Sequence, residues 1–199
     1  SSDDALQAAK MECIIKLVAS AKKLDNGKVA AFVLPQFVKK EDQLAFVKNE
    51  YNGVVIESSF ADKQFFYGKG AGSLPTASAV LSDISALRYE YKYEYKKLYH
   101  HQPNELTDDF YVKAYIGFTD WSFIRKDDIE TVEEFYSHEK TNYLAGFIHF
   151  KKLKESDWWK KNNVSLVLYP NPIIEPQDVL KLKKGKLNKK LPEGFGSPQ

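Results

Sequence analysis

Residues 67–84 read YGKGAGSLPTASAVLSDI, and the rest of the chain is arranged around this stretch. Three glycines, Gly68, Gly70 and Gly72, stand at alternate positions, so the backbone there either takes φ values open only to glycine or passes close to another group. Ser73 then begins a helix, with a proline two positions later and an apolar stripe beyond it. A glycine loop that leads into a helix N-terminus presents N–H groups and partial positive charge, which suit an anionic or polar ligand group.

This loop differs from the two best-known phosphate-binding loops. A P-loop needs a lysine and a serine or threonine after its last glycine, whereas Gly72 is followed by Ser73 and Leu74. The dinucleotide fingerprint follows the first strand of a parallel βαβ unit and precedes an acidic ribose partner, and residues 67–84 lack that context. From the residues alone, a loop that only packs a helix and a loop that binds a ligand are equally well supported.

The composition is that of an ordinary globular protein. The 199 residues are 43% apolar and 28% charged with a net charge of +2, which gives no general case for nucleic-acid binding. The single cysteine, Cys13, excludes an internal disulfide and a cysteine-based zinc site, and its apolar neighbours predict a buried thiol. No apolar run is long enough to span a membrane, and the polar start does not resemble a signal peptide. We therefore expect a cytoplasmic protein without membrane or nucleic-acid partners.

The first hundred residues are expected to form one domain, a mixed sheet with helices over 1–100. Hydrophobic spacing and turn residues predict helices at 3–10 and 41–48, strands at 14–21, 29–38, 54–56 and 63–67, and a long connector helix from Pro75 to Tyr99.

A second domain is expected over 108–172, which makes the chain α+β. Strands are predicted at 110–118, 143–150 and 164–169, and helices at 127–138 and 156–162, with a further hairpin near Lys151. This β-α-β-(β)-α-β order predicts a ferredoxin-like sandwich whose last strand stops at the prolines 170 and 172. The lysine-rich tail, 173–199, is expected to have little packed structure.

Other residue groups give weaker candidates for a site. The four histidines are not spaced as metal ligands, so no metal site is expected. Asp127 and Asp128 are interpreted as caps of the helix at 127–138, and Trp158 and Trp159 as core residues. No serine–histidine–aspartate or cysteine–histidine set can be assembled, so we expect no catalytic residue within this chain.

Residues 67–84 resemble the signature at the end of the catalytic region of the homoserine dehydrogenase family. The family has Gly-x-Gly-Ala-Gly, then Pro-Thr-Ala-Ser-Ala-Val and an aspartate. Residues 15–17 (Ile-Lys-Leu) are similar to a strand of the family, and residues 51–54 (Tyr-Asn-Gly-Val) to its Asn-Ala-Val segment, with Gly53 in place of the commoner alanine. The resemblance covers roughly residues 3–88.

The resemblance implies that the parent protein interconverts aspartate semialdehyde and homoserine with NADPH or NADH, in the pathway to threonine, methionine and isoleucine. The family's Rossmann domain, catalytic lysine and acidic substrate ligands lie upstream of the residues seen here. The chain is then a C-terminal fragment that is inactive alone. Gly72 aligns with the loop glycine that touches the nicotinamide cofactor, and Gly70, Ser73 and Thr76 are expected beside it.

Many members of this family add an ACT domain, a ferredoxin-like module that senses threonine, and the order of elements over 110–170 resembles it. Its usual Asp-x-Pro-Gly loop is represented here by Asp120 without the proline and glycine.

The alternative function, from another class, is a stand-alone amino-acid-binding or oligomerisation module. Several predicted strands lack a partner within the chain, so we also expect a homodimer.

Overall fold

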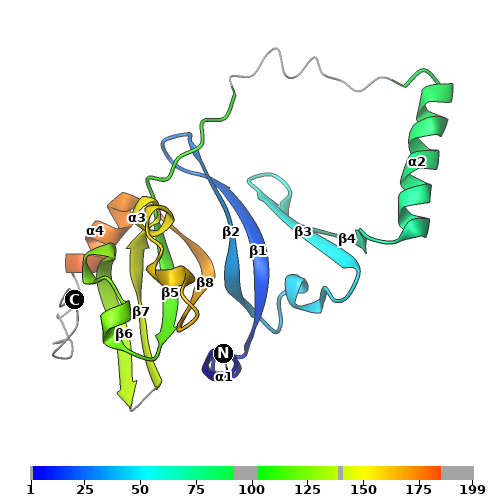
Figure 1. The fold of residues 1–199 in the computed structure, drawn as a ribbon. Coiled ribbons are helices and arrows are strands. Elements are labelled where there is room, and N and C mark those ends of the chain that lie inside the picture. The colour runs from blue at the N-terminus through cyan, green and yellow to red at the C-terminus, as the bar shows by residue number, and fades with distance from the viewer. Residues whose placement is uncertain (1, 92–102, 139–140, 185–199) are drawn as a thin grey trace. The chain divides into compact units, whose positions relative to one another are not determined.

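The chain folds into two compact units in the computed structural model, which describes residues 2–91, 103–138 and 141–184. The first unit combines Ser1–Lys39 with Asn104–Gln199, and the second is Lys40–Pro103 (Figure 1). Both units contain helix and strand, which confirms the expected α+β class. The division differs from the expected domains 1–100, 108–172 and 173–199, because the first two strands complete a sheet that the C-terminal half builds.

Six strands form the sheet of the first unit, in the order β1-β2-β8-β5-β7-β6. Neighbouring strands are antiparallel except β2 and β8, which are parallel and paired at Gln36 and Leu168, so the sheet is mixed as expected. The strands are β1 (Cys13–Lys23), β2 (Val29–Lys39), β5 (Tyr111–Phe118), β6 (Ile129–His138), β7 (Thr141–His149) and β8 (Val164–Ile174).

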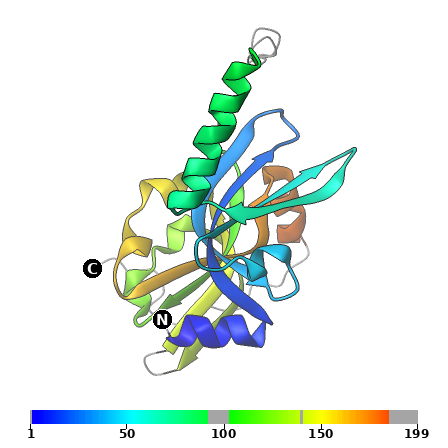
Figure 2. The ribbon, with the colours of Figure 1, turned by 90° about the vertical axis from the view of Figure 1, so that its right-hand side faces the viewer.

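Strands β1 and β2 form the long hairpin that was predicted at 14–21 and 29–38 (Figure 2). Its turn contains Gly27 at φ 81°, a backbone conformation that favours glycine. The expected N-terminal helix is also present as α1 (Ser2–Lys10), which packs against β1. The thiol of Cys13 is buried at the start of β1, as predicted.

The C-terminal strands have the spatial order of a split βαβ arrangement, but the predicted βαββαβ pattern is wrong in its first helix. Strands β5 and β6 are parallel and have β7 between them, and β7 and β8 have β5 between them. The connection from β5 to β6 contains only two short 3-10 turns, Trp121–Phe123 and Lys126–Asp128, within the fully described segment 103–138. Of the helix predicted at 127–138, residues 129–138 form strand β6 instead, and the first two residues belong to the preceding 3-10 turn.

Two β-bulges explain the wrong prediction for β6. The register against β7 shifts between Ile129 and Thr131 and again between Val132 and Glu134. Each bulge adds one residue to the strand, so the core-facing residues Ile129, Val132 and Phe135 recur at intervals of three rather than two. That interval imitates the spacing of an amphipathic helix.

The elements after β7 also differ from the prediction. A short helix, α3 (Phe150–Glu155), replaces the expected hairpin near Lys151, and the helix predicted at 156–162 is only a 3-10 turn, Trp158–Lys160. Strand β8 continues through Pro170 and Pro172, where it was expected to stop. Its register against β5 shifts there, so the prolines lie in an irregular stretch whose N–H groups the ladder does not need.

The tail expected to be unpacked at 173–199 begins with ordered structure. Helix α4 (Pro176–Lys184) follows β8, and Val179 is buried. Glu175, also buried, accepts hydrogen bonds from the N–H of Asp25 at 3.2 Å to both carboxylate oxygens, so it ties the start of α4 to the β1–β2 turn. Residues 185–199 lie outside the described part of the chain.

Removing the Glu175 carboxylate is expected to destabilise the first unit. Glu175→Ala leaves the Asp25 N–H without its charged acceptor, and a hydrogen bond to a charged group contributes about 1.5–3 kcal/mol. Urea denaturation measures the loss, with Glu155→Ala as the control because Glu155 is exposed. Equal stability of the two variants would contradict this role.

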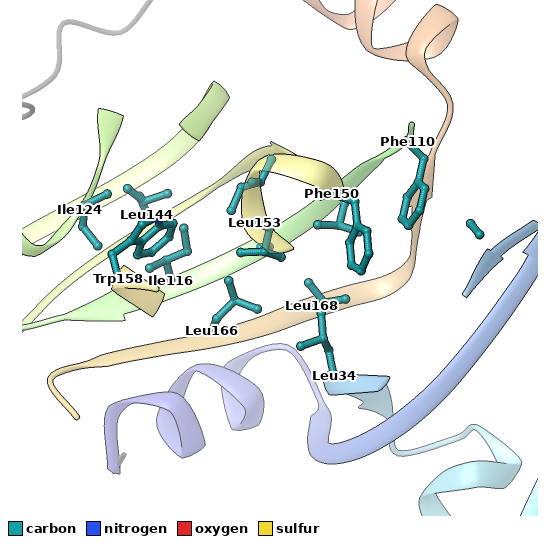
Figure 3. Packing of buried hydrophobic residues seen from close by; sticks show 14 of the residues in the cluster. Leu34, Phe110, Ile116, Ile124, Leu144, Phe150, Leu153, Trp158, Leu166 and Leu168 are labelled. Carbon is teal, nitrogen blue, oxygen red and sulfur yellow. The ribbon is translucent and has the colours of Figure 1, made fainter. Parts of the chain in front are cut away.

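The larger of two hydrophobic clusters in the described part of the first unit receives residues from both ends of the chain. Leu24, Ala30 and Leu34 come from the β1–β2 hairpin, and Figure 3 shows Leu34 beside Leu168 of β8. Phe32 of β2 packs against Phe150 with ring centroids 5.3 Å apart and the ring planes tilted by 34°. The remaining members come from β5 and the residue before it, from β7, α3 and β8, and from the turns between these elements: Phe110, Val112, Ala114, Ile116, Phe118, Ile124, Leu144, Ile148, Leu153, Trp158, Leu166 and Leu168. The two segments therefore fold as one body.

The opposite face of the sheet carries tyrosines. Burial first, and then the Glu134 carboxylate, raise the pKa of Tyr143 to about 12, and the Tyr143 hydroxyl donates to Glu134 at 2.8 Å. Burial is also the main cause that raises the pKa of Tyr169 to about 12. Burial, with Asp4 as the next cause, raises the pKa of Tyr115 further.

These tyrosines predict a loss of stability at alkaline pH. Their pKa is higher in the folded chain than the value near 10 of an unfolded chain, so their contribution is complete below about pH 10 and falls as the pH rises towards about 12. Denaturation midpoints across this range, with tyrosinate absorbance, measure the effect. Tyr143→Phe should make the fall shallower, and a stability that stays flat over the range would refute the prediction.

The described residues of the second unit form a hairpin, a 3-10 turn and one helix. Strands β3 (Tyr51–Ser58) and β4 (Asp62–Lys69) confirm the predicted strands at 54–56 and 63–67, and the helix predicted at 41–48 is a single 3-10 turn, Gln43–Phe46. Helix α2 (Ser73–Arg88) confirms the start of the long helix but ends earlier than Tyr99. Residues 92–99 of that prediction lie outside the described residues.

Candidate functional site

The glycine segment is a short, fixed connection between β4 and α2. Strand β4 pairs with β3 along its whole length, up to Lys69 opposite Tyr51. The next N–H, from Gly70, donates to the carbonyl of Glu50 at 3.1 Å, which extends the pairing by one residue. Helix α2 begins at Ser73, so only three residues join the hairpin to the helix.

Gly72 has a conformation that only glycine adopts readily. Its φ is 119° and its ψ is 156°, and it caps the N-terminus of α2. Its carbonyl accepts hydrogen bonds from the N–H of Thr76 at 3.3 Å and from the Thr76 hydroxyl at 2.9 Å. The backbone at Gly72 is therefore held from inside the helix, and a Cβ at this position would stand 3.4 Å from Cδ of Pro75.

Gly70 is required for a different reason. A Cβ built on Gly70 would overlap Nδ2 of Asn52 and lie 2.7 Å from its Cγ. A Cβ on Gly68 would meet no atom within 4 Å. The three glycines of the motif therefore have three roles: a strained conformation at Gly72, close packing at Gly70, and no steric requirement at Gly68.

The other two predicted residues, Ser73 and Thr76, lie on the first turn of α2. No side chain caps this helix end, and Gly72 has none to offer. The N–H groups of the first turn, including that of Ser73, consequently point out of the helix with its positive dipole end. The Thr76 hydroxyl is bonded to Gly72, so Thr76 holds the loop rather than pointing to a ligand. The four predicted site residues are thus together at one helix N-terminus.

Polar and aromatic contacts support the loop from the hairpin side. The Lys69 ammonium lies 3.0 Å from the Glu50 carboxylate and 5.4 Å from the centre of the Tyr51 ring. Tyr51 stacks on Tyr67 with ring centroids 4.8 Å apart. The pKa of Glu50 lies below its ordinary value. The main cause is a hydrogen bond from the backbone N–H of Glu50 itself, and the second is the hydrogen bond from the Lys69 side chain. Sequence reasoning missed these supports, because they depend on the pairing of β3 with β4.

Helix α2 exposes its apolar side chains. None of its residues is buried, and Leu74, Leu81 and Leu87 are 81%, 65% and 72% exposed. Large apolar residues that repeat along an exposed helix indicate a surface that another protein segment covers. The glycine loop is therefore attached to a helix that is incompletely packed within the described residues.

Several other predicted candidates have structural roles in the first unit. Trp158 is fully buried and Trp159 half-buried, as predicted, while Asp128 caps no helix and is buried against Trp158. Asp120 accepts a hydrogen bond from the N–H of Ser122 at 2.8 Å, and this backbone contact lowers its pKa. His149 lies 3.1 Å from the exposed Asp109 carboxylate. His100 and His101 are outside the described residues.

A helix long and apolar enough to cross a membrane is not found among the described residues.

The glycine loop lies within a segment of the chain that matches a known protein family. Residues 1–85 match the model of the family described as homoserine dehydrogenase. The homoserine dehydrogenase of Mycobacterium tuberculosis strain H37Rv is 41% identical over 81 residues, which are 39% of this chain and 18% of the relative. The Bacillus subtilis enzyme is 32% identical over 87 residues, which are 44% of this chain and 20% of the relative. The predicted resemblance is thus confirmed, and the matched part of the chain spans about a fifth of these relatives.

Solved structures share the fold over a longer part of the chain. A homoserine dehydrogenase from Thiobacillus denitrificans has a TM-score of 0.58 at 19% identity, and the match covers 85% of this chain and 45% of that one. A structure of the S. aureus enzyme has a TM-score of 0.51 at 22% identity. The likeness in fold extends well beyond the 85 residues that match in sequence.

Proposed function

We propose, from the match of residues 1–85 to the homoserine dehydrogenase family, that this chain is the C-terminal part of a homoserine dehydrogenase. The whole protein would interconvert aspartate semialdehyde and homoserine, as an NAD(P)-dependent oxidoreductase in threonine and methionine biosynthesis. The observation that carries the proposal is Gly72, which lies in the matched segment at a helix N-terminus, has no side chain, and has a φ of 119° that other residues rarely adopt. Because Gly72 has no Cβ, a flat ring could come closer to its backbone than to that of any other residue type.

The residues at the loop fit a nicotinamide dinucleotide. When bound, the dinucleotide supplies the hydride of the reaction. The bare backbone of Gly72 would contact the cofactor, and the first-turn N–H groups of α2, including that of Ser73, would favour its negatively charged part. Thr76 holds the Gly72 carbonyl, and Gly70 keeps the loop close to β3. These residues would bind and orient the dinucleotide, whereas the groups that transfer protons are expected upstream of this chain.

The proposal has a direct test in the upstream coding sequence and in the full-length protein. The upstream sequence should encode a Rossmann glycine motif, and the full-length protein should oxidise NADPH or NADH when aspartate semialdehyde is added. The 199-residue chain alone should be inactive, because it lacks a nucleotide-binding domain. Absence of a Rossmann motif, or a full-length protein without this activity, would overturn the proposal.

A stand-alone ACT-like module is the weaker candidate. The connection from β5 to β6 lacks the helix of the βαββαβ pattern, and the C-terminal strands share their core with residues 24–34. Calorimetry of this chain with threonine and with NADPH separates the two candidates, since threonine binding without an upstream enzyme domain would favour the module.

We also propose a homodimer, because β1 and β6 are edge strands of the described sheet, and light scattering of the full-length protein tests it.

A further inference from the structure

The space beside Gly70 is filled by one side chain from the neighbouring strand. Asn52 lies on β3 directly opposite Gly68 of β4. Gly68 has no side chain, so Asn52 has no cross-strand neighbour in its own register position. Its amide instead extends along the hairpin towards Gly70, two residues further on, which is the diagonal contact that long side chains make between antiparallel strands.

Gly70 is consequently held on two sides. Its N–H donates to the Glu50 carbonyl, which fixes the backbone to the start of β3. The Asn52 amide group occupies the position where a Cβ would stand, which fixes the direction in which the chain leaves β4. Two residues later the chain reaches Gly72, the residue with φ 119° that precedes α2. A change in the path at Gly70 therefore changes where the backbone of Gly72 lies.

We infer that Asn52 is a positioning residue for the cofactor-binding loop, acting through Gly70 on Gly72. The inference rests on the proposed function. It adds that the side chain at position 52, and not only the glycines, sets the place of the Gly72 backbone. Gly68 is not part of this arrangement, since a Cβ there would meet no atom within 4 Å, Asn52 included.

A mutant cycle in the full-length protein tests the inference. Gly70→Ala should raise the KM for the dinucleotide by about tenfold to a hundredfold, because small displacements of binding groups have effects of that order. Asn52→Ala should raise KM less, by loosening the loop. The double variant Asn52→Ala/Gly70→Ala should be no worse than Asn52→Ala, because the Nδ2 and Cγ atoms that a Cβ at position 70 would meet are then absent. Gly68→Ala is the matched control and should leave KM unchanged.

A second measurement keeps the inference independent of activity. Hydrogen exchange at the amides of residues 70–74 should be faster in Gly70→Ala and should return to the rate of Asn52→Ala in the double variant. The inference is overturned if Gly70→Ala behaves as Gly68→Ala, or if the losses of the two single variants multiply in the double variant. A full-length protein that binds no dinucleotide would refute the proposed function, whereas the exchange rates would still decide the role of Asn52.

Discussion

Replacement of Gly72 by alanine is expected to lower kcat/KM for the dinucleotide by about tenfold to a hundredfold in the full-length protein. A residue with a side chain at φ 119° and ψ 156° is strained by about 1–3 kcal/mol, and 1.4 kcal/mol corresponds to a factor of ten. The loop can relieve this strain only by rotating Gly72, which breaks the contacts of its carbonyl with Thr76. The added methyl group would also stand 3.4 Å from Cδ of Pro75 and would cover backbone that glycine leaves accessible to a ligand.

The control for this prediction is Gly68→Ala, in the same motif. Gly68 has a φ outside the positive range and open space around it, so alanine fits there without strain. Steady-state kinetics with varied dinucleotide, together with circular dichroism to verify folding, distinguish the two positions. If the two variants lose activity equally, Gly72 has no special role and the assignment of the cofactor-contacting residue is wrong.

The glycine loop could be predicted because its signal is local. Alternating glycines, a serine and a proline directly encode a tight turn and a helix start, and α2 begins at Ser73 as expected. The β1–β2 hairpin was predictable for the same reason, since its turn residues lie between two apolar runs. Asn52 gave no such signal, because its role depends on a contact with Gly70 across the hairpin.

Strand β6 shows where periodicity fails as evidence. Its core residues Ile129, Val132 and Phe135 have helical spacing only because two bulges each insert a residue. Pro170 and Pro172 are similarly misleading, since a register shift in β8 accommodates residues that normally end a strand. In both places the sheet as a whole determines the local structure, and such long-range pairing is not visible in the local sequence.

The shared core also changes how the C-terminal segment relates to the rest of the protein. Residues beyond 85 do not match the family model, yet Leu166, Leu168 and Phe150 pack against residues of the β1–β2 hairpin, which does match it. A segment that needs the hairpin to complete its core is not expected to fold as an independent module. A destabilised C-terminal segment should therefore also loosen the hairpin.

Replacement of Asp128 by alanine is expected to have the largest effect on stability, a loss of about 3–5 kcal/mol. Asp128 is 6% exposed, and its Oδ2 accepts hydrogen bonds from the Ser156 hydroxyl at 2.5 Å and from Nε1 of Trp158 at 2.7 Å. Alanine would leave both donors buried without an acceptor. The same contacts join the β5–β6 connection to the turn that carries Trp158, so their loss should open the core shown in Figure 3.

Asp127 provides a matched control for this prediction. It is adjacent in sequence and equally charged, but it is exposed, so Asp127→Ala should change the free energy of unfolding by no more than about 0.5 kcal/mol. Asp128→Asn keeps one oxygen acceptor and should fall between the two alanine variants. Urea denaturation followed by tryptophan fluorescence measures all three. Had the two aspartates been caps of one helix, both alanine variants would lose similar stability through the helix dipole, so a clear difference between them separates burial from capping.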